Sequence, residues 1–255
     1  MKMHAKNFLS IICICLIIIF IGSSGSAAED FTDASGRWLY TAENGFATIM
    51  DYIDQSADNM MVTYSHMQIP EELDGIPVTS IGDGAFQGRG HLNTVVLPEG
   101  VTFIGSHAFA LCTRLTSVMI PETVKHIGDH AFAGCSSLAA VTIPEGAEQI
   151  EDYLFSHCGA LTAIALPRSI TDIGTWAFAH CDSLAEVILP DGLVSIGAWA
   201  FYDCSGLMSV TIPETVIDIS DYAFFGCDKI QFNVRAGSYA EHFLTEKGYS
   251  CNNIQ

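Results

Sequence analysis

One sequence motif repeats every 23 residues, without insertion or deletion, through more than half of the chain. A phenylalanine marks it at seven positions: Phe86, Phe109, Phe132, Phe155, Phe178, Phe201 and Phe224. An isoleucine precedes each of them by five residues, and six of the eight prolines keep the same spacing. A repeat of about 20 to 50 residues is typical of stacked units that bury their apolar face only against their neighbours. The sequence therefore predicts a solenoid rather than a domain with one central core.

The residue types of one repeat predict the path of the chain through a coil. In Leu138–Ile143 the apolar and small residues alternate, so Val141 and Ile143 would point inward from a short strand. Pro144 ends this strand because proline has no N–H to donate. A second extended piece ends at Ile150, and in most repeats a glycine, a tight helical turn and a cysteine follow. We therefore predict short parallel strands on one face, with tight helical turns and extended segments on the other. The strands are expected near Val95, Val118, Val141, Ile164, Val187 and Val210.

The residues on either side of the repeats predict caps. Asn44-Gly45 stands between two apolar runs, which is a strong local signal for a hairpin. After the repeats, Ser238 is the expected N-cap of a helix over 239–247, with Glu241 completing a capping box and Gly248 ending the helix. The predicted organisation is a signal peptide at 1–28, an N-terminal hairpin cap at 29–74, a seven-coil solenoid at 75–229 and a C-terminal helix cap at 230–255.

The first 28 residues have the composition of an export signal. Lys2 and Lys6 precede an apolar run over 8–21, and Ser26-Ala27-Ala28 offers a cleavage site. This run is shorter than the roughly 20 residues that a membrane-spanning helix usually needs, although a retained anchor is the alternative. We therefore expect a secreted or cell-surface protein that does not insert into the membrane after cleavage.

The charge of the chain restricts its partners. The formal net charge is −19, and removing the signal would take away two lysines but no acidic residue. Such a charge argues against nucleic acid and anionic membranes as partners. An extracellular protein or a glycan remains compatible with it.

Six of the nine cysteines follow the 23-residue spacing. They are Cys112, Cys135, Cys158, Cys181, Cys204 and Cys227. Equivalent positions of a solenoid stack about 4.8 Å apart with parallel side chains, which suits disulfide geometry poorly. We therefore predict a ladder of buried free thiols, with Cys251 outside it.

The consensus L-x-x-V-x-I-P-x-x-V-x-x-I-G-x-x-A-F-x-x-C closely resembles the BspA-like leucine-rich repeats of bacterial surface and secreted proteins. The resemblance covers residues 75–229, about sixty per cent of the chain. Glu151 and Ser220 depart from it by replacing the glycine after the isoleucine. The resemblance implies a right-handed solenoid used for adhesion or recognition, and it carries no catalytic residues over to this chain.

Two rows of side chains are candidate binding surfaces. The fourth position of the I-G-x-x-A-F phrase forms a predicted aromatic stripe, which consists of His107, His130, Tyr153, Trp176, Trp199 and Tyr222. Aromatic platforms suit sugar rings and partner proteins, but the rings could also pack only on one another and stiffen the flank. The second row lies on the strand face and contains Ala165 and Ile188, whose size suits protein contact. The candidate binding residues are Tyr153, Trp176, Trp199, Tyr222, Ala165 and Ile188.

The sequence offers little for catalysis or metal binding. It has no Gly-x-Ser-x-Gly elbow, His-Glu-x-x-His pair or phosphate loop. His157-Cys158 and His180-Cys181 stack in adjacent coils, but neighbouring residues of a tight turn point in different directions. We expect no catalytic residue, metal or cofactor, and predict a non-enzymatic recognition or adhesion module. The alternatives are a hydrolase of cell-surface polymer, with its chemistry in the N-terminal segment, and a purely structural envelope component.

Overall fold

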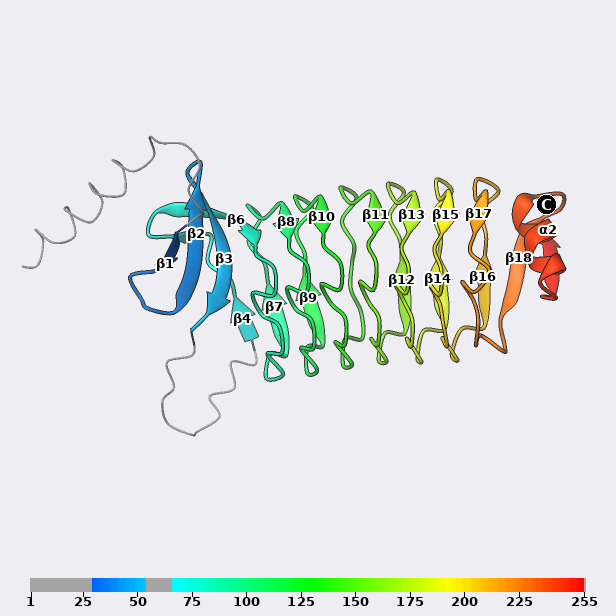
Figure 1. Cartoon of the computed structure of the whole chain (residues 1–255), viewed down its shortest axis with the longest axis horizontal. Coiled ribbons are helices and arrows are strands. Elements are labelled where there is room, and N and C mark those ends of the chain that lie inside the picture. The colour runs from blue at the N-terminus through cyan, green and yellow to red at the C-terminus, as the bar shows by residue number, and fades with distance from the viewer. Residues whose placement is uncertain (1–28, 54–65, 255) are drawn as a thin grey trace, which may run out of the picture.

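The computed structural model describes residues 29–53 and 66–254, and the signal peptide predicted for 1–28 lies outside them. The protein is a solenoid of about eight turns of roughly 23 residues, stacked along one long axis (Figure 1). The seven phenylalanine-bearing coils form its body, and elements at both ends add further turns. The solenoid predicted from the 23-residue period is therefore confirmed.

The N-terminal end is a hairpin that continues directly into the solenoid. Strand β2 (Trp38–Glu43) pairs antiparallel with β3 (Phe46–Tyr52), and β1 (Asp30–Thr32) adds to the outer edge of β2. Asn44 and Gly45 have φ angles of 53° and 83°, as the predicted tight turn requires. Strand β3 then pairs in parallel with β6 (Ile76–Ile81), so the hairpin covers the open edge of the first coil.

Two ladders of short parallel strands run along the solenoid. The first ladder contains β4 (His66–Gln68), β7 (Thr94–Val96), β9 (Ser117–Met119), β12 (Ala163–Ala165), β14 (Glu186–Ile188), β16 (Ser209–Thr211), β18 (Gln231–Arg235) and β19 (Cys251–Ile254). The second contains β6, β8 (Phe103–Ile104), β10 (His126–Ile127), β11 (Gln149–Ile150), β13 (Asp172–Ile173), β15 (Ser195–Ile196) and β17 (Asp218–Ile219), with β5 (Glu72–Leu73) antiparallel to β6. Five of the six predicted strands are confirmed.

The prediction of a strand at Val141 is wrong, because both ladders are interrupted at this coil. Within the described residues, the first ladder has no strand between β9 and β12, and in the second ladder β10 does not pair with β11. Val141 is only partly buried, unlike Val118 and Ile164 in the neighbouring coils. The turn edge nevertheless remains continuous here, since Phe132 N–H donates to the Leu154 carbonyl over 3.1 Å.

The interruption follows from two bulky residues in one coil. Elsewhere the glycine after the isoleucine lies against the preceding coil, and a Cβ on Gly128 would be only 2.6 Å from the Ser106 nitrogen. Glu151 carries a much longer side chain at this position, and its N–H does not bond to the Ile127 carbonyl, whereas the glycine N–H groups of the other coils make the equivalent bond. Leu154, which is buried, also stands where the six other coils have alanine. Ser220 also replaces this glycine, but its coil keeps the alanine. The ladder continues there, since the Ser220 N–H donates to the Ile196 carbonyl over 3.0 Å.

The core is a column of phenylalanine rings, one from each coil. The seven rings are buried, and consecutive centroids lie 5.1–5.7 Å apart. The planes of neighbouring rings differ by 14° or less, so each ring packs its faces on its neighbours. Burying a phenylalanine is worth about 1.5–3 kcal/mol, and the column supplies this contribution in every coil.

The cysteines line the core beside this column and link consecutive coils. All six are free and buried, as predicted. Each thiol donates to the phenylalanine carbonyl 26 residues earlier, over 3.0–3.3 Å. A valine or alanine of similar size could not make this bond, so the thiol adds a hydrogen bond between coils to its packing.

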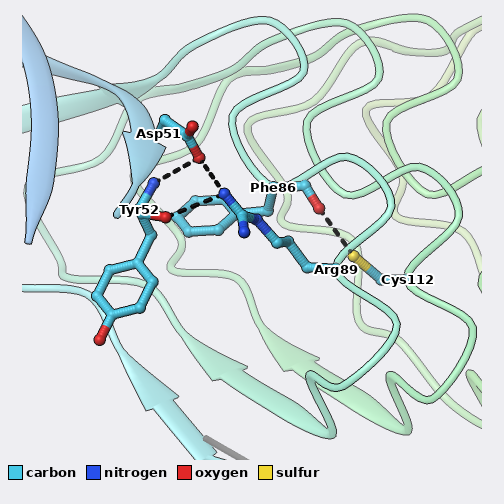
Figure 2. Close-up of polar contacts among 5 residues, drawn as sticks. All are labelled: Asp51, Tyr52, Phe86, Arg89 and Cys112. Carbon is cyan, nitrogen blue, oxygen red and sulfur yellow. Dashed lines mark hydrogen bonds and ion pairs between the residues drawn. The ribbon is translucent and has the colours of Figure 1, made fainter. Parts of the chain in front are cut away.

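In the first coil, Arg89 occupies the position that carries cysteine in the six later coils, and it makes a different contact. Figure 2 shows the Arg89 guanidinium reaching back to the hairpin cap. Its Nη2 donates to Asp51 Oδ1 over 2.6 Å and to the Tyr52 carbonyl over 3.0 Å. One coil later, the Cys112 thiol donates to the Phe86 carbonyl. Both side chains therefore bond to the backbone before them, and the longer arginine spans the step from the coil to the cap.

We expect the thiols of the native protein to react slowly with an alkylating reagent. Burial raises the pKa of Cys112 to about 11 and that of Cys181 to about 12, so little of the reactive thiolate forms at pH 8. Half-buried Cys251 should react before these six, and all seven should react after denaturation. Mass spectrometry of timed samples measures this order, and disulfides among the six buried cysteines would contradict it.

The C-terminal end is closed by β18, helix α2 (Tyr239–Glu246) and β19. Strand β18 pairs in parallel with β16, and β19 pairs with β18. The predicted helix is confirmed: Ser238 Oγ accepts from Glu241 N–H over 3.2 Å, and Glu241 Oε2 accepts from the Gly237 N–H. Across residues 29–53 and 66–254, no helix combines the length and the hydropathy needed to cross a membrane.

Candidate functional site

The aromatic stripe lies on the turn edge of the solenoid, with one ring from each of the six coils after the first. His107, His130, Tyr153, Trp176 and Trp199 all have left-handed backbone conformations, with φ of 57–59°. Glycine adopts this conformation without strain, whereas other residues lose about 1–2 kcal/mol. The first coil does have glycine here, at Gly84. Contacts of the aromatic side chains must offset this cost at these five positions.

The rings of the stripe stack face to face along the solenoid axis. Consecutive centroids are 4.4–5.9 Å apart, and the planes differ by 20° or less. Within the row, the faces between consecutive rings are therefore covered, and the ring edges and the outer faces of the two end rings remain for other contacts. A sugar normally stacks on an aromatic face, so this arrangement suits contact with a protein better than stacking on sugars.

A second row, one position after each core phenylalanine, lies beside the stripe. It contains Gln87, Ala110, Ala133, Ser156, Ala179, Tyr202 and Phe225. Tyr202 and Phe225 stack on each other at 6.0 Å, and Tyr202 lies 5.1 Å from Trp176 and from Trp199. These two residues were not predicted from the sequence, although the 23-residue repeat places them next to the stripe.

The two rows merge into one aromatic surface at the C-terminal coils. We name it the aromatic cluster, and it consists of Trp176, Trp199, Tyr202, Tyr222 and Phe225. Tyr222 and Phe225 are 50% and 53% exposed, while the two tryptophans are partly buried. Three of the four predicted stripe candidates therefore belong to the cluster, and the fourth, Tyr153, stacks on Trp176 from the N-terminal side.

Towards the N-terminus, the small side chains of the second row leave a groove. This turn groove has a volume of about 430 Å³. Its floor is formed by Ala110, Ala133 and Ser156. One wall consists of His107, His130, Tyr153 and Trp176, and the other of Leu111, Gly134 and His157, with Gln87 at the N-terminal end.

Two histidines of the groove walls, His130 and His157, have lowered pKa values that favour the neutral form. Burial lowers the pKa of His130, the nearby His107 lowers it further, and Asp129 and Asp152 act in the opposite direction. Burial and then His180 lower the pKa of His157 in the same way. The ring centroids of both histidine pairs are 4.4 Å apart, so a charge on both members would repel strongly.

No group of three or more metal-ligating side chains is placed to hold a metal ion in the described part of the chain. The sequence pairs His157-Cys158 and His180-Cys181 do not converge on one point. The two histidines stack on the turn edge, whereas the two thiols are fully buried in the core.

The strand-face candidates lie together but apart from the turn edge. Ala165 in β12 pairs directly with Ile188 in β14, and both side chains are exposed. Met119 in β9 is 65% exposed in the same row, but the interrupted coil at Val141 separates it from them. The structure therefore divides the six candidates into two surfaces, one on the turn edge and one on the strands.

The repeated strands, turns and phenylalanine column define a leucine-rich-repeat solenoid. The sequence profile of the BspA type leucine rich repeat region matches in six copies, over residues 60–184 and 102–231. The chain therefore belongs to the BspA-type leucine-rich repeat family.

Two solved structures are similar to the chain. A leucine rich cell surface protein from Faecalibacterium prausnitzii A2-165 is 30% identical, with a TM-score of 0.70 over 83% of this chain and 56% of that one. This chain thus spans little more than half of that protein. The leucine rich repeat protein of T. pallidum is 27% identical, with a TM-score of 0.64 over 87% of this chain and 97% of that one. No curated protein matches the sequence significantly.

Proposed function

We propose that the protein is a secreted or cell-surface recognition module that binds an extracellular protein through the aromatic cluster. The observation that carries this proposal is the exposure of Tyr222 and Phe225 at the edge of a continuous aromatic surface. Exposed apolar patches with aromatic side chains are typical of protein–protein interfaces. The cell-surface protein of similar fold supports the location.

A protein partner fits this surface better than a glycan or a polymer substrate. The ring faces within the stripe are covered by neighbouring rings, which leaves edges and the flanks of Tyr202 and Phe225 for contact. The net charge of −19 disfavours anionic partners. The proposed role is non-enzymatic and uses neither metal nor cofactor, because the cluster contains no nucleophile, general base or metal ligand arranged for chemistry.

A binding screen followed by substitution tests the proposal. The purified protein is screened against immobilised extracellular matrix proteins and a glycan array. The Trp176→Ala/Trp199→Ala double variant should then bind the protein partner at least tenfold more weakly, since central aromatic anchors typically contribute about 2 kcal/mol or more. Phe225→Ala should also weaken binding, and its exposed side chain makes this variant less harmful to the fold.

The control is Phe103→Ala, a partly exposed residue of the second ladder that should leave affinity unchanged. Circular dichroism and a melting curve confirm that each variant is folded. If the double variant melts earlier but the folded protein binds as before, the rings only stiffen the turn edge and the proposal is wrong. Binding to glycans alone would contradict the choice of a protein partner.

A further inference from the structure

The turn groove adjoins the aromatic cluster and shares Trp176 with it, but its other lining residues are its own. Its floor residues, Ala110, Ala133 and Ser156, occupy the register that Tyr202 and Phe225 fill at the C-terminal coils. The groove therefore lies where this row carries small side chains in consecutive coils; Ala179 follows beyond its lining, and the large side chains begin at Tyr202.

The length of the groove suits a short extended peptide. Its aromatic wall runs from His107 to Trp176 across three coil steps, or about 15 Å at about 4.8 Å per step. A polypeptide in an extended conformation advances about 3.3 Å per residue, so about four residues fit along it.

The interior of the groove favours apolar side chains. Alanine forms two of the three floor positions, and Leu111, which is 55% exposed, lines one wall. The turn amides are already used: Leu111 N–H donates to the Ala133 carbonyl, and Gly134 N–H donates to the Ser156 carbonyl, both over 2.7 Å. The polar groups that remain belong to side chains, and the accessible surface of the groove is mainly apolar, which favours apolar side chains of a ligand.

The surroundings of the groove favour a cationic partner. Exposed Asp129 and Asp152 immediately precede the wall residues His130 and Tyr153, and both act electrostatically on His130. Asp182 acts in the same way on His157 at the other wall. None of the residues that line the groove is lysine or arginine. Basic residues on both sides of an apolar segment would therefore find opposite charges at the rim.

We propose that the turn groove binds a short extended segment of a partner protein that carries apolar side chains flanked by lysine or arginine. This inference rests on the proposed recognition function and adds a second contact area with its own chemistry. The apolar side chains would lie on the floor between the two walls, and the flanking cations would lie near the three aspartates.

A model peptide tests the inference without knowledge of the natural partner. The probe is the fluorescein-labelled heptapeptide Lys-Lys-Val-Leu-Val-Lys-Lys, whose binding to the purified protein is measured by fluorescence polarisation. Two matched peptides replace either the four lysines by glutamate or the three apolar residues by serine. We expect the probe to bind at least tenfold more tightly than either of them.

Substitutions then locate the bound peptide. Ala133→Tyr should fill the groove and weaken binding at least tenfold, and the fold should accept it because Tyr202 occupies the same register. Asp129→Asn should weaken binding severalfold. Met119→Tyr adds the same side chain on the strand face and should change nothing.

The outcomes separate this inference from the proposed function. No binding of the probe, equal binding of the serine peptide, or full binding to a folded Ala133→Tyr variant would each overturn the groove as a peptide site. The Phe225→Ala variant should retain probe binding, because Phe225 does not line the groove. If Phe225→Ala leaves the screened partner bound while Ala133→Tyr abolishes probe binding, the groove inference stands and the cluster proposal fails.

Discussion

Replacing Phe155 by alanine is expected to lower the free energy of unfolding by about 3–5 kcal/mol, the cost typical of truncating a buried phenylalanine. The ring is fully buried and stacks on Phe132 at 5.7 Å and on Phe178 at 5.5 Å. Its removal leaves a void between two rings that are fixed by their own coils and cannot close together. Urea denaturation followed by circular dichroism measures the change.

The position of Phe155 should also affect how the protein unfolds. In a solenoid each coil is stabilised only by its neighbours, so a weak coil in the middle divides the array. We expect the Phe155→Ala variant to unfold over a broader range of urea or in two steps. Phe225→Ala is the matched control, because its ring is 53% exposed and its loss should cost less than about 1 kcal/mol. A loss below about 1 kcal/mol for Phe155→Ala would contradict the role given to the column.

The 23-residue period was sufficient to predict the architecture, because residues at equivalent positions of successive coils tend to share the same surroundings. A phenylalanine repeated at every 23rd residue can only be buried in every coil or in none, and the same holds for the cysteines. The C-terminal helix was predictable for a different reason: Ser238, Glu241 and Gly248 encode its two ends locally. Neither inference required knowledge of contacts between distant residues.

Two features of the structure depend on contacts between coils that the sequence alone does not show. We attribute the missing strand at Val141 to Glu151 and Leu154, the two bulky departures in its coil, and a single sequence does not show how such departures change the packing between coils. The groove and the aromatic cluster both form where the aromatic stripe and the second row, one position after each core phenylalanine, lie side by side. The stripe was predicted from one register, so the contribution of Tyr202 and Phe225 was missed. Which of these surfaces binds a partner stays a prediction.

Gly197→Ala is expected to destabilise the protein by about 1–3 kcal/mol, the usual cost of adding a methyl group where no space exists. A Cβ at Gly197 would lie 2.8 Å from both the Gly174 carbonyl carbon and the Ile173 carbonyl oxygen. The coil would have to move away and weaken the bond from Gly197 N–H to the Ile173 carbonyl, which is now 2.8 Å long. Thermal melting measures the destabilisation, and hydrogen exchange at residue 197 measures the opening of the ladder.

The opposite change at the interrupted coil should close a ladder that is now open. In a Glu151→Gly/Leu154→Ala variant, both residues match the other coils, so the coil can approach Gly128 and the amide of residue 151 can donate to the Ile127 carbonyl. We expect slower hydrogen exchange at this amide and no comparable change at residue 220, where the bond already exists. The gain in stability should be small, because glycine loses about 1 kcal/mol more conformational entropy on folding than the residue it replaces. Rapid exchange at residue 151 in a folded double variant would contradict the idea that contact between coils interrupts the ladders. A Gly197→Ala protein as stable as the original would contradict it as well.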